Sequence, residues 1–165
     1  MTPRAPADLV AADLVATDLV AADLDLRPEV CRAGWGELGD ALRRDLVLLR
    51  GCGVDDLDAR PGTEHLWVPD RAGPVAYLRL TRPRGSAPGT VDRVRAGDDV
   101  RGLGLTSVLL ADVLARYGAC GLVVLAPREV RPYLARCGFR PRPGAGGGGD
   151  VRMARAPEAP WRYDG

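Results

Sequence analysis

The sequence predicts a mixed α/β (α+β) domain, in which an antiparallel meander of strands precedes a parallel β-α-β step with flanking helices. Between residues 64 and 96, three short segments with apolar residues at alternate positions are separated only by turn residues. A segment of helical period and a continuous apolar run at residues 121–126 follow, and this order usually makes the strands on either side of the helix parallel. The 165 residues, 46% of them hydrophobic, suffice for one domain with one core.

The first half of the domain is expected to contain one helix and the meander. Leucines at helical spacing predict a helix over residues 35–49, although glycines weaken its first half. Residues 51–63 are rich in glycine and aspartate and are expected to form a loop. Strands are predicted at residues 64–69, 75–81 and 90–96. Because only short turns join them, these strands are expected to pair antiparallel.

The second half alternates helices and strands. Apolar residues at helical spacing predict a helix within residues 101–117, with Gly118 as its C-terminal stop. The strand at residues 121–126 is followed by a short helix near residues 129–136. Further strands are expected around residues 139–141 and 151–154, with a glycine-rich flexible loop at residues 144–149 between them.

The N-terminal segment repeats the unit Ala-Asp-Leu-Val-Ala almost four times over residues 7–24. Five residues advance about 500° around an α-helix, so successive leucines lie about 140° apart and no single apolar face forms. We therefore interpret residues 1–24 as a low-complexity extension, residues 25–156 as the domain and residues 157–165 as a frayed tail.

The composition excludes several classes of protein. The absence of lysine and asparagine rules out a Walker-type phosphate loop, Schiff-base chemistry and a Cys-His-Asn protease triad. The lone histidine, His65, is best explained as structural, and the four cysteines lack a Cys-x-x-Cys spacing, so no metal site is expected. A formal net charge of +1 argues against nucleic-acid and membrane partners. With no apolar run of about 18 residues, we expect a cytoplasmic protein.

A glycine-containing loop stands where the last meander strand ends and the next helix begins. Its residues are Arg101, Gly102, Leu103, Gly104, Leu105 and Thr106. Glycines allow a tight turn and close approach of a ligand, and the N-terminal amides and dipole of a helix favour phosphate. Arg101 can add two parallel donors. A Rossmann motif would need a third glycine and a position after the first strand, so the loop predicts a phosphate or pyrophosphate site of another kind.

This loop resembles the coenzyme A loop of the GNAT acyltransferases, matched here by Arg101-x-x-Gly104-x-Thr106. More narrowly, a series of short segments resembles the ElaA-like branch of that family in the same order. They are residues 52–58, 63–67, 75–79, 93–94, 101–104, 137–139 and 153–155. The resemblance covers about residues 43–155.

The resemblance implies transfer of an acyl group from acetyl-CoA to an amine of a small molecule or peptide. In the family, the pantetheine arm pairs with the main chain of a bulged fourth strand, which here corresponds to Val94, Arg95 and Ala96. The residues of the glycine-containing loop would then hold the pyrophosphate. The cofactor cleft is expected to open between this strand and the parallel strand that follows it.

The catalytic positions match the family less closely. Leu134 stands where the family has its tyrosine acid, and Tyr133 lies one place away, a rotation of about 100° on a helix. We name Tyr133 and Glu64 as the catalytic candidates, with Asp92 and Glu129 as further candidates for the base. The alternatives are a packed aromatic for Tyr133 and surface positions for the carboxylates.

Other departures leave a second hypothesis open. Thr106 replaces the glycine or alanine that usually ends the coenzyme A loop, and Leu49 replaces an acidic residue of the ElaA-like branch. The alternative is therefore a non-catalytic acyl-CoA-binding or protein-interaction module with the same fold.

Overall fold

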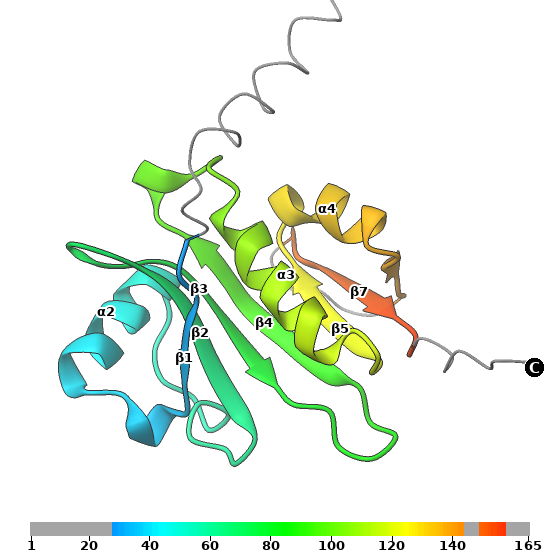
Figure 1. Ribbon diagram of the computed structural model, residues 1–165, viewed down its shortest axis with the longest axis horizontal. Coiled ribbons are helices and arrows are strands. Elements are labelled where there is room, and N and C mark those ends of the chain that lie inside the picture. Colours follow the sequence, from blue (N-terminus) through cyan, green and yellow to red (C-terminus); the bar gives the residue numbers. More distant parts are fainter. Residues whose placement is uncertain (1–27, 144–148, 158–165) are drawn as a thin grey trace, which may run out of the picture.

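The computed structural model describes residues 28–143 and 149–157, and within them seven strands form one mixed sheet (Figure 1). The order across the sheet is β1-β2-β3-β4-β5-β7-β6. The strands are β1 (Cys31–Ala33), β2 (Thr63–Asp70), β3 (Gly73–Thr81), β4 (Gly89–Ala96), β5 (Leu122–Ala126), β6 (Arg140–Pro141) and β7 (Val151–Arg155). β4 and β5 are parallel, and the other neighbouring strands are antiparallel. The predicted fold class is confirmed.

In the sequence of the described residues, helices alternate with or connect these strands. The α-helices are α2 (Asp40–Arg50), α3 (Leu105–Tyr117) and α4 (Arg131–Arg136), and the 3-10 helices are η1 (Trp35–Glu37), η2 (Asp98–Val100) and η3 (Arg128–Val130). The extension predicted at residues 1–24 lies outside the described residues. So do residues 144–148 of the predicted glycine-rich loop and residues 158–165 of the tail.

Two helix starts differ from the prediction. The helix expected over residues 35–49 begins only at Asp40, because the chain is extended at Leu38 and Gly39 after the short turn of η1. Glycine disfavours the helical conformation, so the helical spacing of the leucines was not enough to start the helix at residue 35. The helix expected within residues 101–117 begins at Leu105, since Gly104 has the left-handed φ of 73°. The three-residue strand β1 was missed, because it is too short to show an alternating pattern.

Two apolar clusters pack on opposite faces of the sheet. Leu78 of β3 belongs to the larger cluster, together with Leu109 and Val113 of α3. Its neighbour Tyr77 belongs to the smaller cluster, together with Leu46 of α2. Because successive strand residues point to opposite faces, α3 and α2 cover opposite faces, and Figure 1 shows α3 lying over β4. Among the described residues, no helix combines the length and apolar character needed to cross a membrane.

Candidate functional site

β4 and β5 pair along only part of their length. The parallel ladder ends where Val91 lies opposite Val124. Beyond that point β4 continues to Ala96 and β5 continues to Ala126, each still paired with its antiparallel neighbour. Within the described residues, the last part of β4 therefore has no strand partner on the side of β5, and its main-chain groups on that edge are available to a ligand.

The two strands part at a β-bulge in β4. Tyr77 of β3 lies opposite Arg95. Arg79, two residues after Tyr77 on β3, lies opposite Asp92, which is three residues before Arg95 on β4. Between these two pairs β4 therefore carries one extra residue. In the bulge, Arg93 has a φ of 56°, and it is the one non-glycine residue of the described chain with a positive φ.

The loop before α3 turns through two glycines with left-handed backbone. Gly102 has a φ of 88° and Gly104 a φ of 73°, and a Cβ at either position would meet nothing within 4 Å. No side chain of the described residues caps the N-terminus of α3, so its first amides have no side-chain acceptor there. Arg101 is exposed, and its guanidinium contacts Asp98 three residues earlier.

An open hollow with an empty volume of about 510 Å³, including its mouth, lies between this loop and the free edge of β4. It brings together eight of the nine residues predicted to bind the cofactor, namely Val94, Arg95, Ala96, Arg101, Gly102, Gly104, Leu105 and Thr106. The ninth, Leu103, is 68% exposed and does not line the hollow. The rest of the wall consists of Val100, Pro127 just after β5, Glu129 and Val130. We call this space the loop hollow.

A second hollow, of about 760 Å³ with its mouth, shares Val94 and Arg95 with the loop hollow, so the two adjoin at the bulge. Its wall is strongly charged, in contrast to the glycine-containing wall of the first. It is lined by Arg79, Arg93 and the carboxylates of Asp55, Asp92 and Asp150, among others. We call this space the charged hollow.

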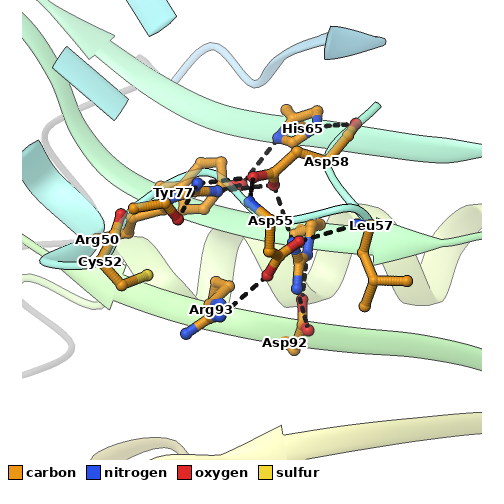
Figure 2. A network of polar contacts seen from close by, with 11 residues as sticks. Arg50, Cys52, Asp55, Leu57, Asp58, His65, Tyr77, Asp92 and Arg93 are labelled. Carbon is orange, nitrogen blue, oxygen red and sulfur yellow. Dashed lines mark hydrogen bonds and ion pairs between the residues drawn. The ribbon is translucent and has the colours of Figure 1, made fainter. Parts of the chain in front are cut away.

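Arg79 of β3 lines the charged hollow and is the centre of a buried ion-pair network. Figure 2 shows the carboxylates of this network, Asp55, Asp58 and Asp92. Its guanidinium binds both carboxylate oxygens of Asp92, at 2.8 and 2.7 Å. It also donates to Asp55 at 2.5 Å and to Asp58 at 2.9 Å. The pKa of the Arg79 guanidinium is raised: burial opposes its charge, but these carboxylates more than offset it. The arginine is only 1% exposed, so three carboxylates compensate one desolvated cation.

Asp58 is fully buried between two arginines. Its two oxygens accept hydrogen bonds from Arg50 at 2.8 and 2.7 Å, in addition to the bond from Arg79. The backbone N–H of Asp55 donates to it at 2.9 Å. Burial alone would raise the pKa of Asp58, but the hydrogen bonds, those from Arg50 foremost, hold it well below its usual range.

His65 has a structural role in this network, as its position in the sequence suggested. Its Nε2 lies 3.1 Å from the backbone carbonyl of Asp58, which can only accept, so Nε2 carries the proton. Nδ1 therefore accepts a hydrogen bond from the hydroxyl of Tyr77 at 2.8 Å. The ring is fully buried, and this burial lowers the pKa of His65 below its usual value.

The structure does not bring the two catalytic candidates to the loop hollow. Glu64 is buried in β2, where its Oε1 accepts a hydrogen bond from Arg82 at 2.8 Å. Tyr133 of α4 packs against the larger apolar cluster beside Cys137. Burial, followed by the influence of Cys137, raises the pKa of Tyr133 to about 12. Leu134, at the position of the family's acid, is fully buried in the core.

Among the three candidates for the base, the structure places only Glu129 in the wall of the loop hollow. Asp92 is held by Arg79. Sequence reasoning missed the network residues Asp55 and Asp58, since the loop at residues 51–63 was interpreted only as a connection. It also missed Arg50, the last residue of α2, which lies just beyond the predicted end of that helix. The signal was present, because residues 52–58 form one of the motifs that resemble the ElaA-like branch.

No protein-family model and no curated protein sequence matches the chain. Solved structures do match, among them an acyl-CoA N-acyltransferase and a putative acetyltransferase of the GNAT family. The overall fold of this chain is therefore that of these acyltransferases.

ElaA from Escherichia coli matches with a TM-score of 0.63 and 21% identity, over 77% of this chain and 98% of that chain. An acyl-CoA N-acyltransferase from Pseudomonas aeruginosa matches with a TM-score of 0.64 and 24% identity, over 78% of this chain and 99% of that chain. An aminoglycoside 6′-N-acetyltransferase solved with coenzyme A matches with a TM-score of 0.55 and 11% identity, over 76% of this chain and 96% of that chain.

Proposed function

We propose that this protein is an acyl-CoA-dependent N-acyltransferase, which transfers an acyl group such as acetyl to an amine of a small molecule or peptide. One observation carries the proposal. Eight of the nine residues that the motifs assign to the cofactor line one hollow, beside the unpaired edge of a bulged strand. The aminoglycoside 6′-N-acetyltransferase of similar fold, solved with coenzyme A, gives independent support.

The residues around the loop hollow fit a diphosphate. The uncapped amides at the start of α3 and the positive end of the helix dipole favour an anion. The open space where a Cβ would stand at Gly102 and Gly104 allows phosphate oxygens to approach the backbone. Arg101 is exposed and can turn from Asp98 to a phosphate with two donors.

The free edge of β4 fits the pantetheine arm. The strand supplies alternating N–H and C=O groups from Val94 to Ala96, and these groups match the amides of pantetheine in the way a neighbouring strand would. Coenzyme A, when bound, supplies the acyl group as a thioester. The adjoining charged hollow then gives the acceptor amine a route to the same point, because both hollows reach Val94 and Arg95.

The protein must bind the amine and take up its proton. In the charged hollow, Asp55 and Asp92 are occupied by Arg79, whereas Asp150 has no ion pair among the described residues and can bind an ammonium group. Glu129 lines the loop hollow, so we assign it the role of base. Glu64 and Tyr133 line neither hollow and receive no role in the proposal. Positioning of the amine beside the thioester supplies a large part of the rate enhancement.

The test separates binding from turnover. Calorimetry with acetyl-CoA measures binding, and release of free thiol across a panel of amines measures transfer. Binding with thiol release for at least one amine supports the proposal. Binding without release for any amine supports the non-catalytic module, which the buried Leu134 at the family's acid position favours. Absence of binding rejects both.

A further inference from the structure

The bulge in β4 decides which side chains of the strand reach the core. Val91 and Val94 are both buried in the larger apolar cluster, although they are three residues apart. In a regular strand, side chains at this spacing point to opposite faces. The extra residue of the bulge therefore turns Val94 inward, and it also sets the direction of the main-chain groups from Val94 to Ala96.

The bulge depends on a left-handed backbone conformation that an arginine at residue 93 disfavours. Arg93 adopts a φ of 56°, in the left-handed region where a Cβ crowds the following carbonyl. Glycine would adopt it without this strain. An interaction made by the arginine side chain must therefore help to keep residue 93 in place.

The side chain of Arg93 is tied to the buried network. Its Nη2 donates to Asp55 Oδ2 at 3.0 Å, and Asp55 Oδ1 accepts from Arg79 at 2.5 Å (Figure 2). Arg79 also binds Asp92, the residue just before the bulge. The network therefore holds two consecutive residues of β4. Arg79 binds Asp92 directly, and it is linked to Arg93 through Asp55. Although burial opposes it, the pKa of Asp55 lies below its usual value, because Arg79 and Arg93 stabilise the carboxylate.

We infer that the ion pair between Asp55 and Arg93 is a positioning device, which holds the bulge of β4 in the form that presents its free edge to acyl-CoA. The loop at residues 51–63 thereby controls a strand that is distant in sequence. This inference rests on the proposed function for the identity of the ligand, but it makes a separate statement about the backbone of β4.

The test exploits the difference between alanine and glycine at residue 93. Arg93→Ala removes the ion pair and keeps the strain, so we expect the Kd for acetyl-CoA to rise about tenfold. Arg93→Gly removes both, and we expect it to bind several-fold more tightly than Arg93→Ala. Asp55→Asn should weaken binding like Arg93→Ala. The same substitution in the Arg93→Gly background should change Kd less than about twofold, since glycine needs no ion pair.

The matched control is Asp56→Asn, which removes the carboxylate of the exposed neighbour and should leave Kd as in the unmodified protein. Equal binding by Arg93→Ala and Arg93→Gly overturns the inference. So does an undiminished effect of Asp55→Asn in the glycine background, which would show that Asp55 acts through Arg79 alone.

A second measurement needs no cofactor. Amide hydrogen exchange of the peptide covering β4 should be about tenfold faster in Asp55→Asn and Arg93→Ala than in Arg93→Gly, with β2 unchanged. If the protein binds no acetyl-CoA, the proposed function fails, and the exchange rates still decide the inference. Equal rates in β4 for all three variants overturn it.

Discussion

Arg79 and Asp92, on neighbouring strands β3 and β4, form a two-point ion pair with bonds of 2.8 and 2.7 Å. The register of the two strands places them directly opposite each other, at the last pair before the bulge. The pair therefore joins the core of the sheet to the segment where the cofactor is proposed to bind. It also connects the charged hollow with Asp58, deep beneath it.

Replacement of Arg79 should be strongly destabilising. In Arg79→Met, three carboxylates lose their shared partner in a buried setting, and we expect a loss of about 3–5 kcal/mol in the free energy of unfolding. Arg79→Lys should recover little, because one ammonium cannot reproduce the geometry of the guanidinium. Urea denaturation measures both. Arg116→Met, which removes a half-exposed pair with Asp112, is the control and should lose less than about 1 kcal/mol. Unchanged stability in Arg79→Lys would contradict this account.

Arg101 should affect binding without affecting the fold. Its side chain is 65% exposed, and among the described residues its one ion pair is with Asp98. We expect Arg101→Ala to weaken binding of coenzyme A about tenfold or more, as for the loss of a charge-assisted hydrogen bond, with nearly the same melting temperature. Calorimetry and thermal unfolding measure the two effects. A large fall in melting temperature would instead make the arginine structural.

Gly104 should be needed for its backbone conformation. Its φ of 73° disfavours any residue with a Cβ, although the space around it is open. Gly104→Ala is expected to cost about 1–2 kcal/mol in stability and to weaken coenzyme A binding, because the relaxed loop turns its amides away from the diphosphate. Gly36→Ala is the matched control, since its surroundings are equally open and its φ is not left-handed. The same loss in both variants would rule out this explanation.

The two candidate bases can be separated by their glutamine variants. Glu129→Gln should lower kcat about 100-fold, with little change in the Kd for acetyl-CoA, because it removes the proton acceptor from the wall of the loop hollow. Glu64→Gln should act chiefly on stability, through the weakened contact with Arg82. A larger fall in kcat for Glu64→Gln than for Glu129→Gln would assign the base to Glu64.

Stability should fall as the pH drops below 7. The pKa of the buried His65 ring is lowered by burial, so the unfolded chain binds a proton at a higher pH than the folded protein does. The stability that neutral His65 contributes is present above about pH 6.5 and is lost as the pH falls toward the lower pKa of the folded state. The chain has one histidine, so thermal unfolding between pH 7 and pH 5 isolates it. His65→Gln should flatten this part of the profile, and an unchanged slope would exclude His65 as the cause.

The carboxylates of the network should affect the stability of the protein at lower pH than His65 does. The folded-state pKa of Asp58 is depressed, so its contribution to stability is present above about pH 4 and lost as the pH falls below that value. We expect the melting temperature of the unmodified protein to fall between pH 4 and pH 2. In Asp58→Asn, which is already destabilised at neutral pH, this part of the decline should be shallower. A decline of the same steepness would show that other groups cause it.

Local pattern was sufficient for most of the fold. Alternation over two residues located β2, β3 and β4, the helical period located α3, and the continuous apolar run located β5 parallel to β4. These elements are determined by the burial of their own apolar side chains, which a single stretch of sequence displays. The glycine-containing loop could be placed for the same reason, since left-handed backbone at Gly102 and Gly104 is a local property.

The arrangement of charge around the bulge depends on contacts between distant parts of the chain. Asp55 meets Arg79 and Arg93 across 24 and 38 residues of sequence, and no local period relates them. Likewise, Arg93 shows no sequence pattern for a positive φ, since arginine adopts that conformation only where surrounding contacts hold it. Local sequence patterns were enough to locate the main strands, helices and the loop. The folded sheet decided which carboxylate holds which arginine, because the strength of an ion pair depends on a distance that only packing sets.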